Sequence, residues 1–145
     1  MNVRHPQTRI MARNRPLVAV VDDDPSIVRS LARVLRLDGY EVATFGSGQD
    51  FLGAISTSIP QCLVLDVHMP KMNGFELQGH LAAEGICVPI IFVTAHDTPQ
   101  TRARAHQCGC SGFFSKPFDP KALSEEIREA VRCQPHDKVA GENQA

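Results

Sequence analysis

The sequence contains no apolar stretch that approaches the roughly 20 residues needed to cross a bilayer. Its N-terminus also lacks the apolar core of a secretory signal peptide. Neither sign of charge is in excess, because 15 lysines and arginines stand against 16 aspartates and glutamates, for a net charge of −1. Such a balance gives no general attraction to nucleic acid or to a membrane surface. These absences predict a cytoplasmic protein that binds neither.

The five cysteines form neither the pattern of a disulfide framework nor that of a structural zinc site. They are odd in number, scattered along the chain and unaccompanied by a secretion signal. Their only close grouping is HQCGC at residues 106–110. This group lacks the second pair of ligands that a structural zinc site requires. We therefore expect small buried thiols rather than a metal site.

Two polar tails enclose the part of the chain that has a core-forming pattern. Residues 1–16 carry four arginines and no acidic residue, which predicts a flexible basic arm. Residues 134–145 are also polar and predict a frayed C-terminal tail. Between them, residues 17–133 have the length of one ordinary domain.

Short apolar bursts alternate with amphipathic stretches along this domain. Several bursts are continuous and rich in β-branched residues, as is typical of strands buried on both faces. We expect strands at 17–21, 41–45, 62–67, 89–95 and 112–116, with helices from Pro25 to before Gly39, after a Ser47 cap through Ile55, after Gly74 through Leu81, near 98–108, and from Pro120 through Val131. Five strand–helix units predict an α/β fold, with a five-stranded parallel sheet and helices on both faces.

Polar side chains stand where four of these strands end. Asp22 and Asp23 follow the first strand, Asp66 ends the third, Thr94 ends the fourth and Lys116 ends the fifth. Ligands of an open parallel sheet bind beyond the carboxyl ends of its strands. We therefore expect these five side chains to converge at one edge of the sheet, and no such gathering at the opposite edge.

The chemistry of this group points to a hard cation and to phosphoryl transfer. Clustered carboxylates cannot all stay ionised unless a cation joins them. Oxygen ligands with room for water suit Mg²⁺, with Mn²⁺ as an alternative. An aspartate beside such an ion can attack phosphorus and form an aspartyl phosphate, while a lysine and a threonine hold the phosphoryl oxygens. Asp24, the third acid of the run, is expected instead to cap the helix that starts at Pro25.

Four motifs, in this order, resemble the signature of the response-regulator receiver family. They are VVDDDPS at 20–26, LVLDVHMPKMNGFEL at 63–77, IFVTAH at 91–96 and GFFSKPF at 112–118. The resemblance covers residues 17–133. It implies a CheY-like, flavodoxin-like doubly wound (βα)5 fold and a phosphoacceptor switch of two-component signalling. Self-phosphorylation and self-dephosphorylation would be its only reactions, so the resemblance does not imply an enzyme in the usual sense.

The resemblance also implies roles for the residues at the strand ends. Asp66 would be the phosphoacceptor. Asp22, Asp23 and Asp66 would hold the metal ion together with the backbone carbonyl of His68. Lys116 would pair with Asp66 and then with the phosphoryl group.

Further positions match parts of the family pattern that respond to phosphorylation. Thr94 would bond a phosphoryl oxygen, and Phe113 stands at the position of the rotameric aromatic switch. Pro117 stands at the family's cis-peptide site. His68 and His96 each lie two residues beyond a site residue, where their side chains either tune the lifetime of the phosphoryl group or are plain exposed loop imidazoles.

The implied phosphodonor is a sensor histidine kinase or a histidine phosphotransfer protein, and the downstream protein target is unknown. A phosphorylation-dependent homodimer is a common outcome in this family. We expect a stand-alone receiver, because the residues after Cys133 are too few and too polar for a helix-turn-helix. The alternatives are the receiver part of a DNA-binding transcriptional regulator, and a metal-dependent phosphatase with an aspartyl intermediate. The sequence does not support the phosphatase. Its usual D-x-D-x-T pattern is missing, because Val67 and His68 follow Asp66.

Overall fold

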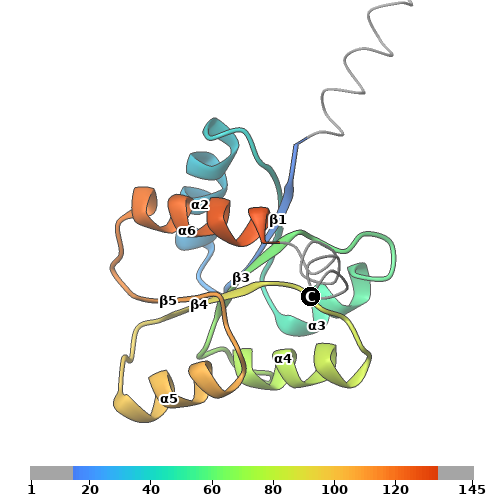
Figure 1. Ribbon diagram of the computed structural model, residues 1–145, viewed down its shortest axis with the longest axis vertical. Coiled ribbons are helices and arrows are strands. Elements are labelled where there is room, and N and C mark those ends of the chain that lie inside the picture. Colours follow the sequence, from blue (N-terminus) through green and yellow to red (C-terminus); the bar gives the residue numbers. More distant parts are fainter. Residues whose placement is uncertain (1–14, 134–145) are drawn as a thin grey trace, which may run out of the picture.

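The computed structural model describes residues 15–133 of the 145-residue chain. Five strands alternate with five helices (Figure 1). The strands are β1 (Leu17–Val21), β2 (Glu41–Phe45), β3 (Cys62–Asp66), β4 (Ile90–Thr94) and β5 (Gly112–Ser115). The helices are α2 (Pro25–Leu37), α3 (Gly48–Ala54), α4 (Gly74–Ala83), α5 (Pro99–Gln107) and α6 (Pro120–Arg132). The predicted C-terminal tail, and the predicted arm before residue 15, lie outside the described residues.

The five strands form one parallel sheet in the order β2-β1-β3-β4-β5. Helices α2 and α6 cover one face, and α3, α4 and α5 cover the other (Figure 1). The strand order reverses at β1, so the loops after β1 and β3 leave the sheet in opposite directions and open a crevice between them. The predicted doubly wound, flavodoxin-like fold is confirmed.

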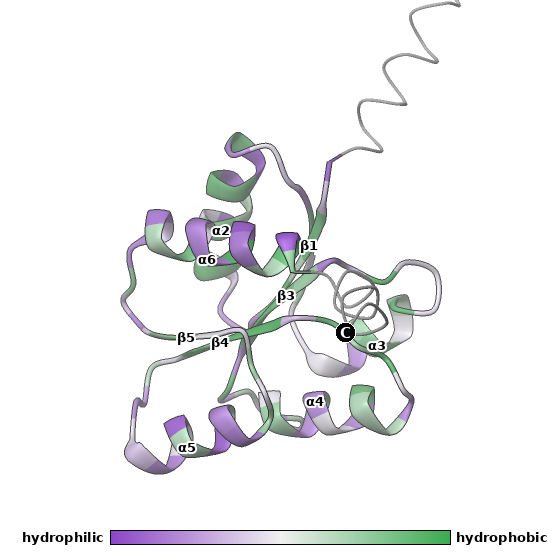
Figure 2. Cartoon of the chain, in the orientation of Figure 1, coloured by the Kyte–Doolittle hydropathy of each residue, from purple (hydrophilic) through white to green (hydrophobic). Residues whose placement is uncertain are grey.

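Each central strand contributes to both hydrophobic cores, because successive side chains of a strand point to opposite faces. In β3, Cys62 and Val64 pack towards α2 and α6, whereas Leu63 and Leu65 pack towards α3, α4 and α5. Figure 2 shows the central strands as mainly hydrophobic and the helices as two-sided. This two-faced burial explains why the strands appear in the sequence as continuous apolar runs.

The expected strands are one residue too long at several ends. The structure ends β3 at Asp66 and β5 at Ser115, one residue before the predicted limits. The amides of the next residues still bond to the sheet, since Val67 N–H donates to Val93 and Lys116 N–H donates to Thr94. The pairing therefore continues slightly beyond the strands and fixes the residues that leave the sheet edge.

Side chains cap the amino ends of the helices as the sequence suggests. The Asp24 carboxylate accepts the Ser26 N–H at 2.9 Å, which confirms its predicted capping of α2. Asn73 and Glu76 form a reciprocal capping box at the start of α4. These short-range bonds start each helix close to the end of the preceding strand, and so keep the loops after β1 and β3 short.

The expectation of five buried thiols is only partly right. Cys62 is buried in β3, and Cys108 and Cys110 are partly buried. Cys87 and Cys133 are exposed, because they lie in the loop after α4 and at the end of α6, where the chain leaves the core. Every helix within residues 15–133 is too short or too polar to span a bilayer.

Helix α4 begins so close to β3 that its first residue has no room for a side chain. A Cβ atom on Gly74 would lie 2.5 Å from the backbone oxygen of Asp66 and 3.1 Å from the Cα atom of Val67. Because backbone atoms cannot rotate away, we expect Gly74→Ala to lower the free energy of unfolding by about 1–3 kcal/mol. Urea denaturation followed by circular dichroism measures the change.

Gly79, in the same helix, is the matched control. Nothing lies within 4 Å of a Cβ atom built at this position. We expect Gly79→Ala to raise the free energy of unfolding by up to about 1 kcal/mol, because alanine favours the helix. Equal effects of the two substitutions would contradict the close approach of α4 to β3.

Candidate functional site

Asp22 leaves the end of β1 and enters a buried position, where its side chain is only 2% exposed. Its Oδ1 atom accepts the backbone N–H of Asp24 at 2.9 Å. Its Oδ2 atom accepts a hydrogen bond from the Nζ atom of Lys116 at 2.8 Å. Asp22 therefore fixes its own loop and also binds the residue that follows β5.

Asp66 ends β3 and is also buried, with 3% of the residue exposed. The Nζ atom of Lys116 lies 3.5 Å from its Oδ1 atom. The ion pair expected between Lys116 and Asp66 is thus present, but the closer partner of the ammonium is Asp22. One ammonium bridges two buried carboxylates, one directly after β1 and one at the end of β3.

The surroundings of Asp66 oppose its ionisation. Burial raises the pKa of this carboxyl to about 7, and the negative charge of Asp22 acts in the same direction. The Lys116 ammonium and the backbone amide of His68 act against both effects without cancelling them. Asp66 is therefore only partly ionised near neutral pH unless more positive charge arrives.

Lys116 is cationic at this site. Burial lowers the pKa of Lys116, but the hydrogen bond to Asp22 and the charges of Asp66 and Asp22 outweigh burial. The net result is a pKa above the ordinary value for lysine. Lys116 therefore supplies a permanent positive charge beside Asp66.

The carboxylates fit a divalent cation. One oxygen each from Asp22, Asp23 and Asp66 lies within 4.8 Å of the others, and within residues 15–133 this is the only such group of three potential ligands. Three carboxylates face one ammonium, so a hard ion that prefers oxygen ligands would relieve the excess negative charge. Asp23 is exposed and presents its carboxylate to solvent. The His68 carbonyl, which follows Asp66 by two residues, stays a predicted ligand.

Thr94 ends β4 with its side chain fully buried. Its Oγ1 atom accepts the backbone N–H of His96 at 3.0 Å. The hydroxyl proton of Thr94 is thereby left to donate to another acceptor. The same bond holds the loop after β4 in its present conformation.

The side chains of His68 and His96 are exposed and lie against each other at the rim of the site. Their ring centroids are 5.2 Å apart and the ring planes meet at 81°. The sequence predicts a position beside the site for each histidine, but not their mutual contact. The contact arises because β3 and β4 are neighbouring parallel strands and place the two loops side by side.

Phe113, on the edge strand β5, is half-buried, and the guanidinium of Arg102 lies 4.9 Å from the centre of its ring. Asp97 accepts two hydrogen bonds from Arg102, at 2.9 Å from Nε and 2.6 Å from Nη2. The hydroxyl of Ser115 also donates to Asp97. The hydrogen bonds from Arg102 and Ser115 lower the pKa of the Asp97 carboxyl below its usual value.

Reasoning from the sequence missed this cluster of Asp97, Arg102 and Ser115. Asp97 and Arg102 are five residues apart, and Ser115 follows Asp97 by 18 residues. Neither separation matches the spacing of neighbours on a helix or along a strand. The one available signal was the place of Ser115, directly before Lys116 at the same sheet edge.

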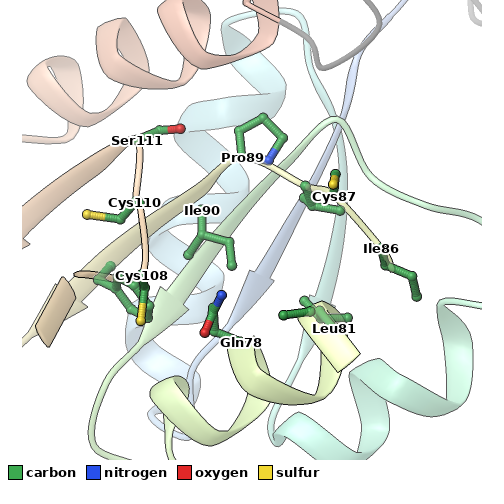
Figure 3. Close-up of a pocket in the computed structure, with 13 residues that line it drawn as sticks. Gln78, Leu81, Ile86, Cys87, Pro89, Ile90, Cys108, Cys110 and Ser111 are labelled. Atoms are coloured by element: carbon green, nitrogen blue, oxygen red, sulfur yellow. The ribbon is translucent and has the colours of Figure 1, made fainter. Parts of the chain in front are cut away.

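The opposite edge of the sheet holds a cleft of about 290 Å³ (Figure 3). It is lined mainly by apolar side chains and by the thiols of Cys87, Cys108 and Cys110. Figure 3 shows these three thiols pointing in different directions. Unlike the carboxyl edge, this edge brings no charged side chains together around its cleft.

Comparison with known proteins identifies a family for this arrangement. Residues 18–128 match the response regulator receiver domain family. Nodulation protein W of Bradyrhizobium diazoefficiens is 41% identical over 121 residues, which are 83% of this chain and 53% of that protein. Transcriptional regulatory protein TdiR of Thauera aromatica is 36% identical over 118 residues, 81% of this chain and 52% of that protein. The chain thus spans about half the length of the curated relatives it matches.

A solved structure agrees with these matches. The response regulator StyR is 41% identical and superposes with a TM-score of 0.79. The similarity covers 90% of this chain and 66% of that chain. The resemblance inferred from the four motifs is confirmed.

Because Asp66 is buried beside Asp22, we expect the stability of the folded protein to depend on pH. In the unfolded chain an aspartate ionises near pH 4, whereas the pKa of folded Asp66 is about 7. Between these values the folded state binds more protons, so stability falls as the pH rises and stays lower above pH 7. We expect Asp66→Asn to match wild type near pH 4 and to exceed it at pH 8, without divalent cations, by on the order of 2–4 kcal/mol.

Urea denaturation in the presence of a chelator measures this difference in the free energy of unfolding. Asp24→Asn is the matched control, because it removes the same charge from an exposed residue of the loop after β1, outside the carboxylate group, and keeps a capping oxygen. We expect it to change stability by less than about 0.5 kcal/mol at either pH. If the wild type is as stable as Asp66→Asn at pH 8, the ionisation of Asp66 does not lower the free energy of unfolding, and the prediction is wrong.

Proposed function

The chain belongs to the response regulator receiver family, and on that premise we propose that Asp66 accepts a phosphoryl group from a phosphohistidine. The observation that carries the proposal is the buried Asp66 carboxylate, which shares the Lys116 ammonium with Asp22. An enclosed carboxylate with a fixed positive charge beside it suits attack on phosphorus. The donor in this proposal is a sensor histidine kinase or a histidine phosphotransfer protein, and the reaction takes place in the cytoplasm.

In the transfer step, a carboxylate oxygen of Asp66 forms a bond to phosphorus while the P–N bond of the phosphohistidine breaks. The donor imidazole leaves with the electron pair and takes a proton from water. Lys116 stabilises the negative charge on the phosphoryl oxygens throughout. Mg²⁺, or Mn²⁺ in its place, would be held by Asp22, Asp23, Asp66 and the His68 carbonyl, and would supply the additional positive charge that keeps Asp66 ionised.

This chemistry makes the protein a switch rather than an enzyme with external turnover. Its own side chain is the acceptor, and slow hydrolysis of the aspartyl phosphate by water resets it. We propose that the imidazoles of His68 and His96 lengthen the life of the phosphoryl group by shielding it. Both rings are exposed at the rim and in contact with each other.

The output of the switch would begin at Thr94. A phosphoryl oxygen on Asp66 offers an acceptor for the free hydroxyl proton of Thr94, and inward movement of Thr94 would release space for Phe113. The guanidinium of Arg102 lies over this ring and is bonded to Asp97, so movement of Phe113 would disturb that cluster. We propose that the resulting change in the face formed by α5, α6 and β5 is read by a downstream protein, or by a second copy of the chain.

A second candidate is the receiver part of a DNA-binding transcriptional regulator. It is favoured by the similarity to TdiR, a transcriptional regulatory protein of which this chain spans 52%. Salt-dependent binding of promoter DNA by the full natural polypeptide would support this candidate over the separate receiver predicted from the sequence. The phosphoacceptor chemistry at Asp66 is the same in both.

Chemical phosphorylation tests the acceptor. We expect acetyl phosphate with Mg²⁺ to add one phosphoryl group to the wild type and none to Asp66→Asn, as measured by the mass of the intact protein. Beryllium fluoride with Mg²⁺ should shift the amide resonances of Thr94 and Phe113 in the wild type alone. Asp24→Asn keeps the acceptor and should react as the wild type does. If neither the wild type nor Asp66→Asn is labelled, or if both are labelled equally, the proposal is contradicted.

Hydrolysis of the phosphorylated protein tests the two histidines. We expect His68→Ala and His96→Ala to lose the phosphoryl group faster than the wild type, by up to about tenfold, because water gains access to phosphorus. The rate follows from the mass of the intact protein with time after removal of the donor. His80→Ala, an exposed position on α4, is the control and should leave the rate unchanged. Wild-type rates in both rim variants would exclude shielding.

A further inference from the structure

His68 and His96 come from two loops that adjacent parallel strands bring together. The two rings touch edge to face at 5.2 Å between centroids. Within residues 15–133 neither imidazole makes a hydrogen bond or an ion pair through its side chain. The ring nitrogens of both histidines are therefore free to bind another partner.

The separation of the rings matches a known geometry of metal coordination. A Zn–N distance of 2.0–2.1 Å places each imidazole centroid about 3.2 Å from the metal, so two imidazoles at the tetrahedral angle have centroids about 5 Å apart. His68 and His96 lie at this separation without any movement of the backbone. Because both side chains are exposed, each ring can turn to direct a nitrogen at a common point.

We propose that His68 and His96 form a second cation site, selective for a borderline divalent transition ion such as Zn²⁺. Imidazole nitrogen suits Zn²⁺, Ni²⁺ and Cu²⁺, whereas Mg²⁺ prefers oxygen. The carboxylates of Asp22, Asp23 and Asp66 therefore take a hard ion, and the imidazole pair takes a softer one. Water completes the coordination at this exposed position, as at zinc sites with open positions.

Other nitrogen and sulfur ligands in the described part of the chain are less suitable. His80 and His106 lie singly on α4 and α5, without a second imidazole in ring contact. The thiols of Cys87, Cys108 and Cys110 at the opposite edge point in different directions (Figure 3). In residues 15–133, the His68–His96 pair is the only pair of histidine rings in contact.

A bound ion would also act on the switch, and this consequence rests on the proposed function. It would tie the loop after β3 to the loop after β4, directly beside Asp66. The backbone N–H of His96 already bonds the hydroxyl oxygen of Thr94. Holding His96 in place would keep Thr94 in its present position and cover the approach to Asp66. Zn²⁺ at this site would therefore slow phosphorylation.

Calorimetric titration of tag-free protein with Zn²⁺ tests the site, in the presence of excess Mg²⁺. We expect one bound Zn²⁺ in the wild type and in Asp66→Asn, with at least tenfold weaker binding in His68→Ala and in His96→Ala. His80→Ala and His106→Ala are matched controls that keep wild-type affinity. Nuclear magnetic resonance should show shifts of the His68 and His96 imidazoles on addition of Zn²⁺, and unchanged thermal unfolding would establish that each variant is folded.

Two results would overturn the proposal. Undiminished Zn²⁺ affinity in both His68→Ala and His96→Ala would place the ion elsewhere. Loss of Zn²⁺ binding in Asp66→Asn, or on addition of Mg²⁺, would place the ion among the carboxylates.

The regulatory consequence has a separate measurement. We expect Zn²⁺ to slow the labelling of the wild type by acetyl phosphate and Mg²⁺. In His96→Ala, the labelling rate should be the same with and without Zn²⁺. Unchanged labelling of zinc-bound wild type would overturn the regulatory consequence. A wild type that is never labelled, even without Zn²⁺, would contradict the phosphoacceptor function and leave the calorimetric result to decide the metal site.

Discussion

The shared use of one ammonium by two buried carboxylates dominates the chemistry of this protein. Lys116 lies 2.8 Å from Asp22 and 3.5 Å from Asp66, and so links the ends of β1, β3 and β5. One positive charge faces the three carboxylates of Asp22, Asp23 and Asp66, and burial together with the negative charge of Asp22 raises the pKa of Asp66. The site is therefore stabilised by any further cation. A metal ion is the simplest way to ionise the residue that we propose as the nucleophile.

The parallel sheet is the reason these groups meet at all. Parallel strands end at the same edge, so residues far apart in the sequence are delivered to one place. The capping box that starts α4 and the close approach of Gly74 to Asp66 keep the intervening loop short. The same arrangement brings His68 and His96 into contact, since their loops leave neighbouring strands in the same direction. The carboxylate cluster and the imidazole pair are thus two products of one topology.

A set of contacts leads from Thr94, at the same sheet edge as the carboxylates, to the outer surface. Thr94 bonds the amide of His96, and the next residue, Asp97, bonds Arg102 of α5 and Ser115 of β5. Arg102 in turn lies over Phe113. The loop after β4 therefore contacts α5 and β5, which are two of the three elements of the proposed output face. In the proposed switch, a displacement of Thr94 would reach that face through these bonded and packed groups.

Much of the fold and the membership of the candidate site could be predicted from the sequence alone. Strand positions, the Asp24 cap and the polar residues at strand ends depend on short-range periodicity and on local hydrogen bonds, which the order of residues records. Only the tertiary structure decided that Asp22 is the closer partner of Lys116, that Asp97 joins Arg102 and Ser115, and that Cys87 is exposed. The tertiary structure also decided the raised pKa of Asp66. Burial and the distances between charges exist only once distant segments have packed.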